Sequence, residues 1–213
     1  MSRLDKEDHQ AIEEAISKAE AATSGEIVFA AAPASARYRH ATLQGALIGM
    51  AVVTALFLLI FRPPHNITSL LWTEFISFAA FYAIVPYLPW RRWIISRNEM
   101  DARVKEAALM QFYSSGLYKT REENGVEIYL SFFEREVVVI GDRGIHAKMG
   151  ERHWQNVRDL IISGIRRGDA RGGICAAIEA CGKALAEHFP PRPDDVNELP
   201  NKVIDRPLGP EAP

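Results

Sequence analysis

Three acidic residues of this sequence, Glu134, Asp142 and Glu151, fall in segments predicted as loops beside strand ends. Carboxylates from separate loops can converge on one point, and hard cations such as calcium prefer several oxygen ligands at such a place. One interpretation of these acids is therefore a calcium site formed by Glu134, Asp142 and Glu151. The alternative is a solvated rim of loop acids that binds nothing. A metal that binds only the folded state raises the melting temperature, so metal addition separates the two interpretations.

Other catalytic motifs are absent from the sequence. The six histidines include no H-E-x-x-H motif, and no G-x-S-x-G elbow presents a serine nucleophile. Gly168 and Gly173 have the glycine spacing of a phosphate-binding loop, but Ile174 stands where that loop requires lysine. This stretch therefore predicts a boundary between two helices. The sequence therefore identifies no catalytic residue and no cofactor-binding motif.

Two separated stretches of the chain carry the pattern of one soluble domain. Residues 1–36 contain a helical pattern and a strand, too little for a stable core. Residues 98–189 add a helix, two strands and two further helices. Together they predict one α/β domain in which helices cover a small sheet. The acidic, proline-rich residues 190–213 predict a flexible tail.

The chain between these stretches is apolar. Residues 42–61 contain no charged side chain, and at about 1.5 Å per residue they span the hydrocarbon core of a bilayer. Residues 67–90 form a second, less uniform apolar segment, so we expect a transmembrane hairpin inserted into the soluble domain. Gly45 and Gly49 have the G-x-x-x-G spacing that lets helices approach closely. This spacing is compatible with packing inside the hairpin and with a homo-oligomer formed through Gly45 and Gly49.

Charge predicts the orientation of the hairpin. Arginines flank its two ends on one side, whereas the turn between the apolar segments contains a single basic residue, Arg62. Because basic residues stay on the cytoplasmic side, both termini and the soluble domain are expected in the cytoplasm of a bacterial inner membrane. The net charge of −2 gives no reason to expect a nucleic-acid partner. The flanking arginines are Arg37, Arg39, Arg91, Arg92 and Arg97.

Several short motifs in the soluble part resemble the TPM domain family. They occur in the family's order at Glu20–Val28, Asn124-Gly125-Val126, Glu134-Arg135-Glu136-Val137, Gly141-Asp142-Arg143-Gly144-Ile145, Trp154 and Ala186–Pro190. The resemblance implies a TPM-like α/β/α sandwich, and members of the family have been linked to photosystem repair, acid phosphatase activity and calcium binding. This chain departs from the familiar layout because its anchor is internal, which puts a lumenal role in doubt.

We therefore expect a membrane-anchored TPM-domain protein that acts mainly as an interaction or accessory module. Its predicted partners are the lipid bilayer and another membrane protein. The alternative is a metal-dependent hydrolase that resembles acid phosphatases. Calcium is the one cofactor expected, because both the loop acids and the resemblance to the family point to it.

Overall fold

The computed structural model describes residues 4–61, 66–148, 151–192 and 197–207. The chain divides into two compact units, one formed by residues 1–35 with 101–209 and the other built on residues 36–100. The first unit thus draws on chain segments from both sides of the second.

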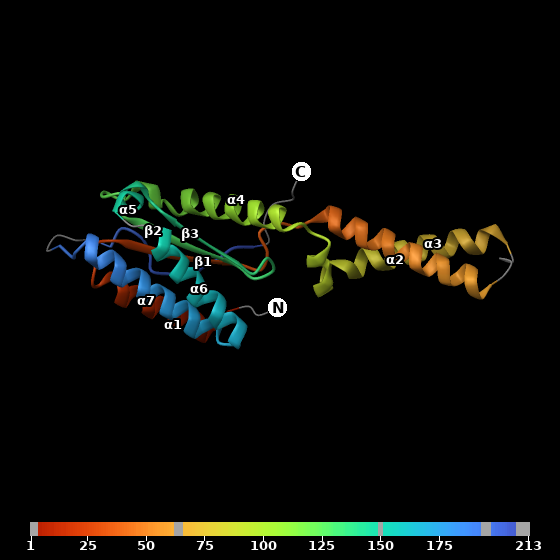
Figure 1. Cartoon of the computed structure of the whole chain (residues 1–213), viewed down its shortest axis with the longest axis horizontal. Helices are drawn as coiled ribbons and strands as arrows, with labels where there is room; N and C mark the ends of the chain where they lie inside the picture. Colours follow the sequence, from red (N-terminus) through yellow and green to blue (C-terminus); the bar gives the residue numbers. More distant parts are fainter. Residues whose placement is uncertain (1–3, 62–65, 149–150, 193–196, 208–213) are drawn as a thin grey trace. The chain divides into compact units, whose positions relative to one another are not determined.

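A mixed β-sheet forms the centre of the first unit (Figure 1). Among the described residues it has four strands in the order β3-β2-β1-β4. β1 pairs in parallel with β2 and β4, whereas β2 and β3 form an antiparallel hairpin. All seven residues of β1 are buried, so this strand is central although it comes from the start of the chain. The strands are β1 (Glu26–Ala32), β2 (Gly125–Ser131), β3 (Glu136–Gly141) and β4 (Ile204–Asp205).

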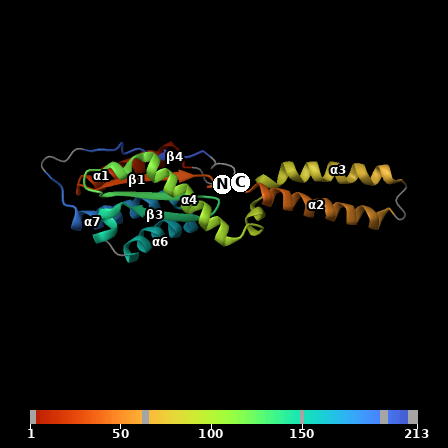
Figure 2. The same cartoon turned by 90° about the horizontal axis from the view of Figure 1, so that it is seen from above.

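Helices cover both faces of this sheet. Helices α1 (Lys6–Glu20), α6 (Glu151–Arg167) and α7 (Ala170–His188) lie on one face, and α4 (Arg97–Ser115) lies on the other (Figures 1 and 2). Successive side chains of a strand point to opposite faces of the sheet, so each strand contributes to both layers. Phe29 and Ile128 join the core under α1, α6 and α7. Their neighbours Ala30 and Tyr129 pack instead against Val104, Ala107 and Ala108 of α4. The α/β fold predicted from the sequence is confirmed. Two short elements complete the unit: η3 (Leu117–Lys119) and α5 (Arg143–Lys148).

Side-chain caps and glycines define the helix boundaries. The first helix begins after Asp5, whose Oδ1 accepts the backbone amide of Asp8 at 2.8 Å. The segment from Gly168 to Gly173 is the predicted helix boundary, because α6 ends at Arg167 and α7 begins at Ala170. A Cβ atom at Gly173 would lie 2.8 Å from the Gly164 Cα, so glycine at this position lets α6 and α7 cross closely.

The segment after Pro190 differs from its prediction as a flexible tail. Residues 197–207 lie against the first unit, and Ile204 and Asp205 form β4 beside Ala30 and Ala31 of β1. The Arg206 amide extends this pairing by donating to the Ala31 carbonyl at 2.9 Å. Proline content predicted a tail here, but the open edge of β1 offers backbone partners that no local pattern reveals.

The second unit contains a hairpin of two long apolar helices, α2 (Arg39–Ile60) and α3 (Ile67–Ile84). By length and composition, the helices over residues 39–60 and 67–87 could each cross a membrane. Gly45 and Gly49 face the returning chain, since a Cβ atom at Gly49 would lie 2.4 Å from the Phe81 ring and one at Gly45 would lie 2.9 Å from Val85. These glycines therefore serve packing inside the hairpin. Two short helices follow α3: η1 (Val85–Tyr87) and η2 (Pro89–Trp93).

Candidate functional site

Three loops of the first unit meet at the end of the sheet where β1 and β2 begin. Because these strands are parallel and pair Glu26 with Gly125, the loops that precede them lie side by side. β3 is antiparallel to β2 and ends opposite Val126, which brings Gly141 and Asp142 to the same end. Three of the motifs that resemble the TPM family, at residues 20–28, 124–126 and 141–145, are thereby gathered in one place, which we call the loop end of the sheet. The motif at residues 134–137 lies at the opposite end.

Buried hydrogen bonds hold these loops together. Asn124 donates its side-chain amide to the Ser24 carbonyl, and the Glu26 amide donates to the Asn124 carbonyl at 3.3 Å. The Thr23 hydroxyl donates to the Phe189 carbonyl at 2.6 Å, which ties the first loop to the end of α7. Since Thr23, Ser24 and Asn124 are all buried, these bonds fix the loop backbones before any ligand arrives.

Two carboxylates are oriented at the loop end. Glu20 Oε1 accepts the Ile27 amide at 2.9 Å, and Glu26 Oε1 accepts the Glu198 amide at the same distance. A cavity of about 200 Å³ adjoins Glu20, Glu26 and Ser24, together with Asn197 and Asn201. The oxygen-rich lining suits a small polar ligand better than an apolar one.

The structure places two of the three acids predicted to share a calcium ion at opposite ends of one strand. Glu134 precedes β3 and Asp142 follows it, so a strand roughly 20 Å long lies between them. Glu151 is the first residue of α6, but its side chain lies outside the described residues. Within the described part of the chain, no three His, Cys, Asp or Glu side chains are grouped closely enough to hold a metal ion. The sequence already placed one acid before and the other after the strand predicted at residues 137–140, so their separation follows from the length of an extended strand.

Glu134 is buried, and both of its carboxylate oxygens accept hydrogen bonds from nearby residues. Its Oε1 accepts the Ser35 amide at 2.9 Å, and its Oε2 accepts the Ser131 hydroxyl. These contacts close the turn between β2 and β3 against the end of β1. Glu134 therefore positions backbone at the end of the sheet opposite the loop end.

Asp142 lies at the loop end itself. Its amide donates to the Gly125 carbonyl at 2.9 Å, and its Oδ1 accepts the Arg143 amide at 2.7 Å. Its Oδ2 is buried and has no hydrogen-bond partner among the described residues. Of the three predicted acids, Asp142 is the one that the structure places among the convergent loops.

Sequence reasoning missed Glu127, a fully buried acid in the middle of β2. Its two carboxyl oxygens have no hydrogen-bond partner in the described part of the chain. Burial raises the pKa of Glu127 to about 9, although the nearby Arg206 guanidinium acts in the opposite direction. The alternation of β2 predicts that Glu127 faces away from the main core, but only the structure shows that α4 covers that face.

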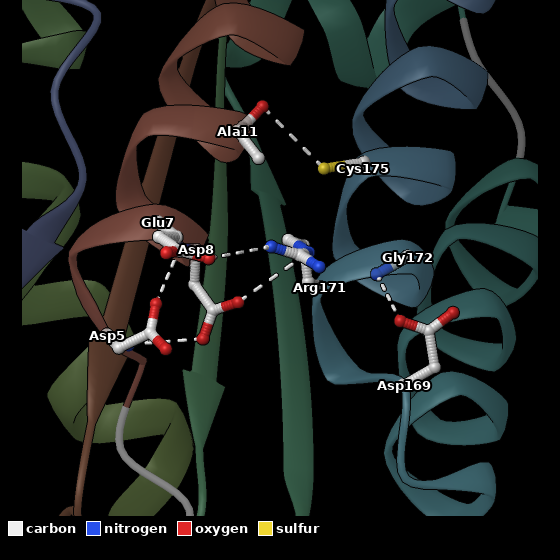
Figure 3. Close-up of polar contacts among 8 residues, drawn as sticks. All are labelled: Asp5, Glu7, Asp8, Ala11, Asp169, Arg171, Gly172 and Cys175. Carbon is white, nitrogen blue, oxygen red and sulfur yellow. Dashed lines mark hydrogen bonds and ion pairs between the residues drawn. The ribbon is translucent and has the colours of Figure 1, made fainter.

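The two cysteines, Cys175 and Cys181, are free thiols. Complete burial raises the pKa of Cys181 to about 12, whereas Cys175 is partly exposed between α1 and α7 (Figure 3). Trp154 packs in the core with Val157 and Ile161.

Comparison with known proteins agrees with this fold. The family model of the TPM domain matches residues 93–184. Residues 93–184 therefore belong to a TPM domain, and we use this name below for the first compact unit. The TPM match begins after the apolar hairpin, so α1 and β1 lie outside the matched range although they belong to the same compact unit.

A solved structure resembles the chain over nearly its whole length. The BA42 protein of the psychrophilic bacterium Bizionia argentinensis, determined by NMR, shares 23 % sequence identity and a TM-score of 0.61. The similarity covers 96 % of this chain and 97 % of BA42, and at this sequence identity it shows a shared fold alone. A search of curated proteins finds no match to the sequence.

Proposed function

We propose that this protein is a membrane-anchored accessory protein, in which the α2–α3 hairpin holds the TPM domain at a lipid bilayer. There the TPM domain binds another membrane protein. The exposed apolar surface of the hairpin carries this proposal, and an exposed apolar patch on the TPM domain supports its second half.

The hairpin has the surface of a membrane segment. Only 17 % of the most apolar stretch within residues 39–60 and 6 % of that within residues 67–87 are buried, whereas the core helix of a soluble protein would be mostly buried. Leu47, Ile48, Ile67 and Phe75 are each at least half exposed. In water this apolar surface would be exposed, whereas in a bilayer the lipid chains would cover it.

The flanking charges support one orientation. The five arginines named above flank the ends of the hairpin that join the TPM domain, and Arg62 alone lies in the turn. With the basic side held in the cytoplasm, both termini and the TPM domain face the cytoplasm of a bacterial cell. A fluorescent reporter fused to the C-terminus should then fold and emit, and an exported phosphatase reporter at the same place should stay inactive.

The TPM domain offers an apolar surface for a partner. Leu109, Met110 and Tyr113 of α4 and Tyr118 of η3 are all exposed, between 46 % and 62 %, and we call them the α4 patch. The rings of Tyr113 and Tyr118 lie 5.6 Å apart, so the patch is continuous there. Aromatic and methionine side chains are enriched in protein interfaces, which suits this surface to a partner protein.

Alkaline extraction of membranes tests the anchor. The full chain should stay in the membrane pellet, and the double variant Leu47→Arg with Ile76→Arg should be released because each substitution puts a charge on the lipid-facing surface. Gln10→Arg with Gln155→Arg is the control, since both glutamines are exposed on helices of the TPM domain. Release of the unmodified chain would overturn the anchor.

Photo-crosslinking in intact membranes tests the partner. A photoreactive residue at Tyr113 should give a discrete crosslinked species, and the same residue at the exposed position Gln155 should not. Leu109→Ser with Met110→Ser should abolish the species because these changes remove the apolar contact. If crosslinking at Tyr113 resembles that at Gln155, the α4 patch does not bind a partner.

A phosphatase is the second candidate, since the matched family model carries the name TPM phosphatase and Asp142 lies beside Arg143 at the loop end. Hydrolysis of a generic phosphomonoester that requires calcium, magnesium or manganese and is lost in Asp142→Ala would support it. Glu134→Ala serves as a comparison, because Glu134 lies at the other end of the sheet. No activity with any of the three metals would remove this candidate.

A further inference from the structure

One acidic residue, Glu74, lies within the apolar length of the α2–α3 hairpin. It is the eighth residue of α3, so the helical rise of about 1.5 Å per residue places it roughly 10 Å from the start of that helix. The apolar run of residues 67–87 has the length of a hydrocarbon core, so Glu74 falls inside that core and not at its edge. Acids at such a depth are costly in lipid, and they usually face other protein groups and pair with them.

Glu74 lies on the side of α3 that faces α2. The two helices run side by side (Figures 1 and 2). Helical periodicity puts Glu74 in line with Ser77 and Phe81, three and seven residues further along α3. Phe81 packs on Gly49 of α2, and Ser77 is buried. Glu74 is itself partly buried, so its side chain lies at the margin of the contact between the two helices.

The hairpin leaves polar groups of this contact unsatisfied. Within the described part of the chain, the only hydrogen bond at Glu74 outside the helical backbone is the one that its carbonyl accepts from Ser77 Oγ at 3.0 Å. On α2, Thr54 Oγ1 is buried and has no partner among the described residues. In the register that the two glycines of α2 set, Thr54 is about level with Ser77. The described helices therefore leave a carboxylate and a hydroxyl unpaired within the apolar length.

The two apolar segments contain no basic residue that could pair with Glu74. Residues 42–61 carry no charge, and Glu74 is the only charged residue between 66 and 90. Arg62 is the nearest arginine or lysine in the sequence, and it precedes α3. A second copy of the chain would bring a second acid to the same depth, and like charges repel one another. Charge complementarity therefore favours a different protein that supplies the base.

We propose that Glu74 pairs with a lysine or arginine in a membrane-spanning helix of another protein, which packs beside α2 and α3. This inference rests on the proposed function and deepens it, because it names a contact of the partner within the bilayer. A carboxylate and a basic group that meet in lipid neutralise one another, so each is less costly than it would be alone. Apolar side chains give little preference for one neighbouring helix over another in lipid, so the charge pair selects the partner helix.

Photo-crosslinking next to Glu74 tests this contact in intact membranes. Leu71 and Ile76 are both more than half exposed, but Leu71 lies one helical turn from Glu74 whereas Ile76 points to the opposite side of α3. A photoreactive residue at Leu71 should give a discrete crosslinked species, and the same residue at Ile76 should not. Mass spectrometry should find that the attached peptide is an apolar segment that contains lysine or arginine. A species at Leu71 whose attached segment lacks a basic residue would overturn the proposal, and so would the absence of any species.

Substitutions of Glu74 separate its charge from its shape. Glu74→Gln keeps the shape and removes the charge, so it should lower the yield of the Leu71 species at least about tenfold, whereas Glu74→Asp should retain most of it. Arg62→Gln is the control for pairing within the chain, and it should leave the yield unchanged. All three variants should stay in the membrane pellet on alkaline extraction, so that a lower yield reports the contact and not failed insertion.

Two results with these variants would contradict the contact. Equal yields from Glu74→Gln and the unmodified chain would show that the charge selects no partner. Equal losses from Arg62→Gln and Glu74→Gln would place the partner of Glu74 in this chain. Crosslinking at Tyr113 reports on the proposed function separately, so a species at Tyr113 without one at Leu71 would overturn the Glu74 contact and leave the accessory role standing.

Discussion

The environment of individual buried residues decides how this TPM domain responds to pH. Glu127 is enclosed between β2 and α4 with a pKa raised to about 9, so the folded state binds its proton at neutral pH. In the unfolded chain the carboxyl has its ordinary pKa of 4.5 and releases that proton. Folding therefore takes up a proton between these two values, and stability from this group is complete below about pH 4.5 and is lost as pH rises toward 9.

Replacing Glu127 by glutamine tests this linkage. Glutamine keeps the shape and cannot ionise, so Glu127→Gln should raise the free energy of unfolding at pH 7–8 by on the order of 2–3 kcal/mol. At pH 5 the gain should nearly vanish. Urea unfolding of both proteins across this range measures the difference, with the exposed Glu106→Gln on α4 as the control. Parallel stability profiles for the variant and the unmodified chain would show that Glu127 is ionised in the folded state.

At the scale of elements, the C-terminal segment completes the sheet. β4 is only two residues long, yet it covers the edge of β1 and precedes Arg206, whose guanidinium donates to the Ala107 carbonyl at 2.7 Å. The segment therefore connects the edge of the sheet to α4. Exposed strand edges promote aggregation, so this cover protects the fold.

Ile204 and its neighbour provide a matched test of this role. Ile204 packs against the core beside α4, whereas the Asp205 side chain is 66 % exposed. Ile204→Asp should lower the free energy of unfolding by about 1–3 kcal/mol and increase light scattering on heating, because it puts a charge against apolar residues. Asp205→Asn should change stability by less than about 0.5 kcal/mol. Equal effects of the two substitutions would mean that β4 contributes little to the sheet.

The hairpin depends on close contact between its helices. Since a Cβ atom at Gly49 would overlap the Phe81 ring, Gly49→Leu should separate α2 from α3 and lower the melting temperature of the detergent-solubilised chain. Ala51→Leu adds the same side chain at an exposed position of α2 and serves as the control. Similar melting temperatures for the two variants would show that Gly49 does not limit this packing.

At the scale of the whole molecule, the TPM domain is discontinuous in sequence. β1 pairs with β2 and β4, while α1 packs on α7, so residues 1–35 contribute both a central strand and a covering helix. Their removal would expose apolar faces of β2 and α7 together. The range matched by the family model omits both elements.

A fragment of residues 97–213 should therefore fail to fold. We expect no cooperative thermal transition by circular dichroism and strong binding of a hydrophobic dye, because Ile12, Ile16 and Phe29 leave the core. Supplying residues 1–36 as a separate peptide should restore part of the native signal. A cooperative transition in the fragment alone would contradict this dependence.

The sequence determined the local features of this protein. Alternating strands, helical stripes such as that of Trp154 and Val157, and the uncharged run of residues 42–61 each follow from side-chain periodicity and apolarity, which act over a few turns of chain. The order of short motifs was enough to indicate the TPM domain. Glu134 and Asp142 could be placed beside strands for the same reason.

Only the tertiary structure decided which residues distant in sequence lie close together. It gathered Glu20, Ser24 and Glu26 at the loop end, and it enclosed Glu127 beneath α4. It also seated β4 on β1, where the sequence predicted a flexible tail. These relations depend on which strands pair and in which direction. Such pairing joins segments far apart in the chain, whereas side-chain periodicity reports only on a few neighbouring residues.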